Sequence, residues 1–156
     1  LIFNNLATNT LMRIEGPCGT FFIRKNECPV IFIAGGTGFA PVKAMVESLI
    51  NDGISRDIYI YWGMAKAGHF YSTVPAEWAS QYDNIHYIPV VSGDDADWQG
   101  RKGYVHQAVM ADFASLADFD VYACGSPLMI EASKKDLTTL GLPAERFYSD
   151  AFTVSK

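Results

Sequence analysis

The chain has 156 residues, a formal net charge of −5, and 49% hydrophobic against 19% charged residues. This composition is typical of one globular domain with a full core, and the length is too short for two ordinary domains. The acidic charge without a basic cluster disfavours a nucleic-acid partner. No apolar run approaches the ~20 residues of a membrane-spanning helix, and no basic-then-apolar leader suggests secretion. We therefore expect a cytoplasmic protein without a membrane partner.

The N-terminal residues differ from the rest of the chain. The stretch "LMRIEGPCGTFFI" is typical of two short strands joined by a Gly-Pro turn, and no helical pattern follows it. We interpret residues 1–28 as the C-terminal remnant of another unit, a β-barrel, and residues 29–156 as an α/β domain. The first residue is Leu1 rather than methionine, which suggests a fragment of a longer protein.

Apolar runs rich in Val, Ile and Tyr, without polar alternation, predict strands that are covered on both faces. They are Val30–Ala34, Ile58–Trp62, Ile85–Val91 and Val121–Cys124. Helical patterns cover residues 42–50, 75–82, 105–113 and 129–140. This alternation of strand and helix predicts an α/β fold with a doubly wound, parallel sheet of about five strands.

A glycine-rich turn follows the first of these strands. Gly35, Gly36, Thr37 and Gly38 form the turn, and Pro41 suits the first position of the helix that follows. Glycines there let the backbone approach a phosphate, towards which the helix N-terminus directs free amides and a positive dipole. The lysine of a Walker loop is absent, which disfavours nucleoside triphosphate hydrolysis. The alternative is a tight strand-to-helix turn without a ligand.

A second strand end has the same character. Cys124 and Gly125 end a strand, Ser126 is a good N-cap, and Pro127 is a good first helical residue. Two glycine-containing strand ends, each followed by a helix with an early proline, predict a cleft at the carboxyl edge of the sheet. Cys124 would point into this cleft. The alternative is a small buried hydrophobic residue.

Cysteines and histidines give no metal pattern. The three cysteines, Cys18, Cys28 and Cys124, are odd in number and widely spaced, so they predict neither a disulfide framework nor a metal or iron–sulfur site in this chain. The three histidines are isolated and lack the spacing of a zinc site. A reducing compartment fits this cysteine usage.

Taken together and in order, "GGTGFAP", "IYIYWG", "WQGRKGYVHQAV", "YACGSP" and "ERFYSDAF" resemble the pyridine-nucleotide half of the ferredoxin-reductase family. The resemblance covers nearly the whole chain, and "RIEGPCGTFF" looks like the last strands of that family's flavin-binding barrel. Within the family the chain looks most similar to the CDP-6-deoxy-glucoseen reductases, which carry a plant-type iron–sulfur domain. Flavin reductases without a cluster come next.

The resemblance implies a set of site residues. Thr37 and Cys124 would be the catalytic residues near the nicotinamide, and Phe152 would lie against the flavin ring. The other implied cofactor-binding residues are Gly35, Gly36, Gly38, Pro41, Gly63, Lys66, Ser92, Arg101, Gly125 and Pro127. Of these, Gly63 and Lys66 would lie at the adenosine end.

The resemblance also implies an activity for the parent protein. A hydride would pass from NADH to FAD, and single electrons would then pass to an iron–sulfur cluster and an electron-acceptor protein. The FAD would belong to the flavin domain of the same parent chain, so this chain alone would be inactive. The alternatives are a cluster-free NAD(P)H:flavin reductase and a non-catalytic nucleotide-binding module.

Nucleotide preference can be predicted from one loop. NADPH-using relatives place a Ser-Arg pair after the strand that matches Ile85–Val91, whereas this chain has "SGDDAD". Ser92 is kept, but Gly93 stands at the arginine position and three aspartates follow. Negative charge near the 2′-phosphate of NADPH would be repulsive. We therefore expect NADH to be preferred, without absolute exclusion of NADPH.

Overall fold

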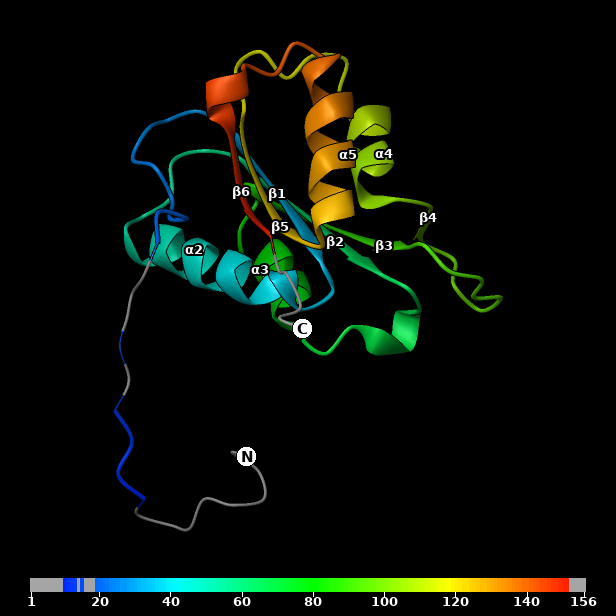
Figure 1. Cartoon of the computed structure of the whole chain (residues 1–156), viewed down its shortest axis with the longest axis horizontal. Coiled ribbons are helices and arrows are strands. Elements are labelled where there is room, and N and C mark those ends of the chain that lie inside the picture. The colour runs from blue at the N-terminus through cyan, green and yellow to red at the C-terminus, as the bar shows by residue number, and fades with distance from the viewer. Residues whose placement is uncertain (1–9, 14, 16–18, 152–156) are drawn as a thin grey trace.

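The computed structural model of the chain describes residues 10–13, 15 and 19–151 (Figure 1). The described residues before Val30 contain no strand, although the sequence pattern predicted two. An extended segment forms a strand only when a neighbour supplies the ladder of hydrogen bonds, and no described strand lies alongside this one. The assignment of residues 1–28 to another domain stays a prediction.

The domain is built on one parallel sheet with the strand order β4-β3-β2-β1-β5-β6. Its strands are β1 (Val30–Gly35), β2 (Ile58–Met64), β3 (Ile85–Val91), β4 (Arg101–Lys102), β5 (Asp120–Gly125) and β6 (Phe147–Ala151). The predicted α/β class is confirmed. The sheet has six strands rather than about five: four match the predicted apolar runs, and the two additional ones are β6 and the two-residue edge strand β4, which pairs only with Val90 and Val91. Such a strand is too short to leave an apolar pattern in the sequence.

Helices cover both faces of the sheet (Figure 1). On one face lie α2 (Phe39–Asn51) and α3 (Val74–Gln81), and on the other lie α4 (Val105–Asp112) and α5 (Pro127–Thr138). Short 3-10 turns follow β1, follow β2 and precede β6: η1 (Gly36–Gly38), η2 (Ala67–His69) and η3 (Ala144–Arg146). Side chains of β1 alternate between two buried clusters, which is why its sequence is apolar throughout.

The path of the chain creates a switch point between β1 and β5. From β1 the chain runs outward through β2 and β3 to the edge strand β4, then crosses back to add β5 and β6 on the other side. The helices that follow β1 and β5 therefore lie on opposite faces of the sheet. In open α/β sheets, ligands bind at the carboxyl ends of the strands at this point.

The two helices with early prolines begin differently. Pro127 is the first residue of α5, and the Ser126 hydroxyl accepts a hydrogen bond from the Met129 N–H at 3.3 Å, as expected for an N-cap. By contrast, α2 begins at Phe39, so Pro41 is its third residue rather than its first. Proline is tolerated there because the first four N–H groups of a helix have no partner within the helix.

Candidate nucleotide-binding cleft

A cleft of about 810 Å³ opens at the carboxyl edge of the sheet. It is lined by the glycine turn after β1, the end of β2 with Ala65 and His69 beyond it, Ser92 after β3, the first turn of α4 with the loop before it, and the first two turns of α5. Segments that are far apart in the sequence thus converge at the switch point. This size is within the range of small-molecule sites in proteins.

The ends of β1 and β5 approach each other through glycines. A Cβ atom on Gly125 would lie 3.2 Å from the backbone N and Cα of Gly35, and one on Gly35 would lie 2.6 Å from the Met129 sulfur. A Cβ atom on Gly38 would lie 2.1 Å from the Cys124 carbonyl oxygen. The two strand ends singled out in the sequence therefore meet, and their glycines are required for close backbone packing.

The electrostatics of the cleft come from the backbone rather than from charged side chains. The N-terminal turns of α4 and α5 both line it, and a helix N-terminus carries free N–H groups and a partial positive charge. Among the described residues that line the cleft there is no carboxylate, lysine or arginine. An anionic group can therefore be held there by amides without a competing negative side chain.

Four of the predicted binding residues line the cleft: Gly35, Gly36, Gly63 and Ser92. The structure places the others outside this lining: Thr37, Gly38, Pro41, Lys66, Arg101, Cys124, Gly125 and Pro127. Of these, Gly38, Cys124 and Gly125 are buried behind the cleft, while Thr37 and Lys66 are exposed. Phe152 lies outside the described residues. The assignment of cofactor contacts to these residues stays a prediction.

Arg101 already has an ion-pair partner within the domain. Its guanidinium forms an ion pair with Asp112 at the end of α4. The Asp112 carboxylate also accepts a hydrogen bond from the Tyr61 hydroxyl at 2.7 Å. Burial and this carboxylate raise the pKa of Tyr61, so the hydroxyl stays protonated and donating. Arg101 would have to leave Asp112 to reach a nucleotide.

Cys124 is fully buried at the end of β5. Burial raises the pKa of its thiol to about 12, and the negative charge of Asp150 contributes in the same direction. The side chain is therefore a neutral thiol at physiological pH and not a thiolate nucleophile. Its backbone carbonyl oxygen lies against Gly38 of the glycine turn.

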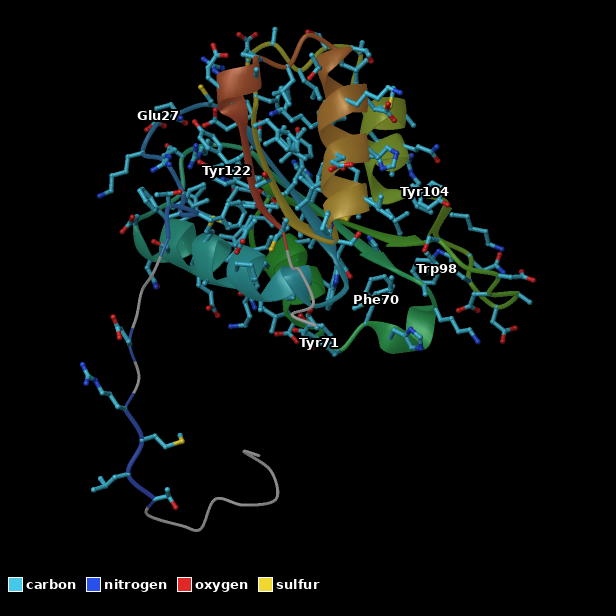
Figure 2. The ribbon with its side chains drawn as sticks, in the orientation of Figure 1. Glu27, Phe70, Tyr71, Trp98, Tyr104 and Tyr122 are labelled. Carbon is cyan, nitrogen blue, oxygen red and sulfur yellow. The ribbon has the colours of Figure 1, made fainter. Side chains whose placement is uncertain are left out.

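Most residues that line the cleft were not among the predicted binding residues, and Tyr104, Leu128 and His106 are three of them. Tyr104 and Leu128 are 61% and 79% exposed and line the cleft from the starts of α4 and α5 (Figure 2 labels Tyr104). His106 is buried; its Nε2 lies 3.4 Å from an Asp136 carboxylate oxygen, and its Nδ1 has no hydrogen-bond partner within the described part of the chain. The quoted "GYVHQAV" contained two of these residues, but helical periodicity alone cannot separate a cleft-facing side chain from a core one.

The acidic loop after β3 (residues 92–97) is hydrogen-bonded to the segment that follows β2. Asp95 accepts a hydrogen bond from the Ala67 N–H at 2.9 Å, and the Trp98 indole donates one to the Arg101 carbonyl at 2.7 Å. The rings of Trp98 and Phe70 lie with centroids 6.0 Å apart (Figure 2). The loop therefore has a defined position beside the end of β2.

Residues 10–13, 15 and 19–151 contain no group of three or more His, Cys, Asp or Glu side chains placed to hold a metal ion. In the same part of the chain, none of the helices has both the length and the apolar character needed to cross a membrane.

Comparison with known proteins identifies the family. Residues 32–135 match the family model described as an oxidoreductase NAD-binding domain. The chain belongs to this family. The matched region of this NAD-binding domain runs from β1 into α5 and so includes the glycine turn and all the described residues that line the cleft. The resemblance stated from the sequence motifs is confirmed.

Two curated relatives and one solved structure are similar to almost the entire chain. Protein RfbI of Salmonella typhimurium is 67% identical over 99% of this chain and 47% of its own length. The CDP-6-deoxy-L-threo-D-glycero-4-hexulose-3-dehydrase reductase of Yersinia pestis is 55% identical over 100% of this chain and 47% of its own length. The cytochrome P450 reductase GcoB of Amycolatopsis is 28% identical, with a TM-score of 0.85 over 99% of this chain and 47% of that protein. This NAD-binding domain thus spans about half the length of the curated relatives it matches.

Proposed function

We propose that this NAD-binding domain holds NADH for a flavin-dependent reductase that supplies electrons to an acceptor protein. Bound NADH would supply the hydride, FAD in the flavin domain of the same parent chain would accept it, and an iron–sulfur cluster of the parent would pass on single electrons. The observation that carries the proposal is the cleft at the switch point, with two helix N-termini and no lining carboxylate, in a chain of the NAD-binding family. The names of the Yersinia and Amycolatopsis relatives support the proposal that electrons pass to an acceptor protein, since each name describes the reductase of a second enzyme.

The described residues fit a dinucleotide. The space beside Gly36, where a Cβ atom would have nothing within 4 Å, suits a pyrophosphate, and the amides at the starts of α4 and α5 complement its charge. The exposed ring of Tyr104 and side chain of Leu128 offer apolar surfaces for the adenine. The adenosine half would extend towards Gly63 and Ser92, and the nicotinamide half towards Thr37 and Cys124.

The preference for NADH is part of the proposal. Ser92 lines the cleft, and the aspartates of residues 94–97 follow directly after it. Their charges would repel the 2′-phosphate of NADPH, although solvent and salt reduce the effect. Lys66 and Lys102 are exposed cations that would partly offset this repulsion. We expect a preference of about ten- to a hundredfold in kcat/KM.

The test is anaerobic mixing of the full-length protein with NADH while the visible absorbance of the flavin is followed. Rapid bleaching, together with measured iron and acid-labile sulfide, supports the whole proposal. Bleaching without iron or sulfide would identify a cluster-free flavin reductase. Tight NADH binding without any bleaching would identify a non-catalytic nucleotide-binding module and overturn the proposed reaction.

A further inference from the structure

The indole of Trp62 connects the end of β2 with the glycine turn after β1. Its Nε1–H donates a hydrogen bond to the Gly36 carbonyl oxygen at 2.9 Å, and its side chain is fully buried. Its ring stacks on that of Phe39, the first residue of α2, with centroids 4.2 Å apart and planes inclined by 17°. A residue outside the cleft lining therefore holds the turn that lines the cleft.

The Gly36 oxygen is held on the side of the sheet away from the cleft. It also accepts a hydrogen bond from the Phe39 N–H, so both of its lone pairs are occupied. Trp62 and Phe39 belong to the core beneath α2 and α3, whereas most of the cleft lining comes from the starts of α4 and α5 on the opposite face, with further side chains such as Met64 and His69 from the end of β2 and beyond. The carbonyl thus points away from the space that an anionic group would occupy.

The orientation of this oxygen fixes the orientation of the next amide. In a trans peptide the C=O and the N–H of the same plane point in opposite directions. With the Gly36 oxygen held towards Trp62, the Thr37 N–H is directed towards the cleft side. Gly36 has a φ of +58°, and a glycine has several other conformations of similar energy. A rotated peptide would present a carbonyl oxygen to the cleft, which would repel an anion.

We propose that Trp62 is a positioning residue for the dinucleotide: its indole N–H fixes the Gly36–Thr37 peptide so that the turn offers an amide to the pyrophosphate. This inference rests on the proposed function, because it assumes that a dinucleotide binds in the cleft. A net hydrogen bond of ordinary strength predicts about a three- to tenfold loss of affinity when the donor is removed. The loss should appear in Kd and KM for NADH, with little change in kcat.

The decisive variant is Trp62→Phe, which keeps an aromatic ring against Phe39 and removes the N–H donor. The matched control is Trp78→Phe. Trp78 is also buried and lies near Phe39, with ring centroids 6.5 Å apart, but it forms no hydrogen bond to the turn among the described contacts. The probes are ADP-ribose, which contains the pyrophosphate, and AMP, which does not. Trp62→Phe should weaken ADP-ribose and leave AMP unchanged, whereas Trp78→Phe should leave both unchanged.

The outcomes separate this inference from the proposed function. If the unmodified protein binds neither NADH nor ADP-ribose, the proposed function fails. If it binds both and Trp62→Phe binds ADP-ribose equally well, or if both Trp variants lose the same affinity, only the role of Trp62 fails. If Trp62→Phe does not fold, NMR of the unmodified protein decides: the Thr37 amide resonance should shift strongly on addition of ADP-ribose, and an unchanged resonance overturns the inference.

Discussion

Gly38 packs so closely against Cys124 that a Cβ atom on the glycine would lie 2.1 Å from the cysteine carbonyl oxygen. The contact joins the turn after β1 to the end of β5, the two strands between which the topology switches. A shift of either segment therefore displaces the other. The glycine turn and the segment Cys124–Pro127 act as one structural unit, although they lie far apart in the sequence.

Gly38→Ala should damage this unit. The added methyl group would collide with backbone atoms, which cannot move aside as a flexible side chain can, so we expect a loss of stability of about 1–3 kcal/mol and weaker binding of NADH. Gly68→Ala is the matched control, because a Cβ atom there has nothing within 4 Å. Urea unfolding and NADH titration measure both effects. Equal behaviour of the two variants would show that the close contact is unimportant.

The acidic loop can be tested by removing charge rather than by adding it. A side chain at Gly93 would place its Cβ atom 2.3 Å from the Ala65 carbonyl oxygen, so Gly93→Arg would shift the backbone as well as change the charge. Replacing Asp94, Asp95 and Asp97 together by asparagine avoids this problem. In Asp95→Asn the side-chain carbonyl oxygen could still accept the hydrogen bond from the Ala67 N–H.

For this triple variant we expect kcat/KM with NADPH to rise about tenfold at low salt and kcat/KM with NADH to change little. The gain should shrink as salt is added, because screening weakens interactions between exposed charges. The control is Asp118→Asn. Asp118 is exposed and lies just before the start of β5, at the amino ends of the strands, whereas the cleft lies at their carboxyl ends. An unchanged NADPH/NADH ratio in the triple variant would show that the loop lies away from the 2′-position.

The buried thiol of Cys124 predicts a pH dependence of stability. Its pKa is raised from 9.0 to about 12 in the folded chain, so above about pH 9 the unfolded chain releases a proton that the folded chain keeps. The contribution to stability is complete below pH 9 and is lost as the pH rises towards 12. Cys124→Ala should therefore show a smaller decrease in the free energy of unfolding across this window. A slope should remain, because burial also raises the pKa of Tyr87 and of Tyr122 to about 12.

A buried polar network anchors the segment that leads into β1. The Asn26 amide donates to an Asp120 carboxylate oxygen and accepts from the Arg56 guanidinium, both at 2.6 Å. Arg56 also donates to the carbonyls of Arg24 and Cys28, at 3.1 and 3.2 Å. Arg56 and Asp120 are 6% and 1% exposed, so this charge pair is shielded from water.

Arg56→Met should destabilise the domain by about 3–5 kcal/mol, because among the described residues it leaves the buried Asp120 carboxylate with Asn26 as its one side-chain partner. Arg101→Met removes the same charge from an exposed pair with Asp112 and should cost less than about 1 kcal/mol. Urea unfolding compares the two. Tryptic cleavage after Lys25 should also become faster in Arg56→Met, and equal stabilities would contradict a structural role for the network.

The sequence by itself determined the fold class, the parallel sheet and the positions of most elements. Signals of this kind are local: an apolar run such as Ile85–Val91 indicates a strand covered on both faces, and Ser126-Pro127 contains the cap and first residue of its own helix. Because parallel strands end at one edge of the sheet, the convergence of the two glycine-containing ends could also be predicted.

Tertiary structure alone decided which side chains the cleft uses and how they are held. The Trp62 indole reaches a carbonyl 26 residues away, Arg101 pairs with Asp112 instead of facing the cleft, and Tyr104 is exposed while its neighbour Val105 is buried. Periodicity constrains the face of an element on which a residue lies, but not the distant group that it meets there. The Trp62 contact depends on the parallel pairing of β1 with β2, and the Arg101 contact on the position of α4 beside β4, so residues that share no local pattern are brought together.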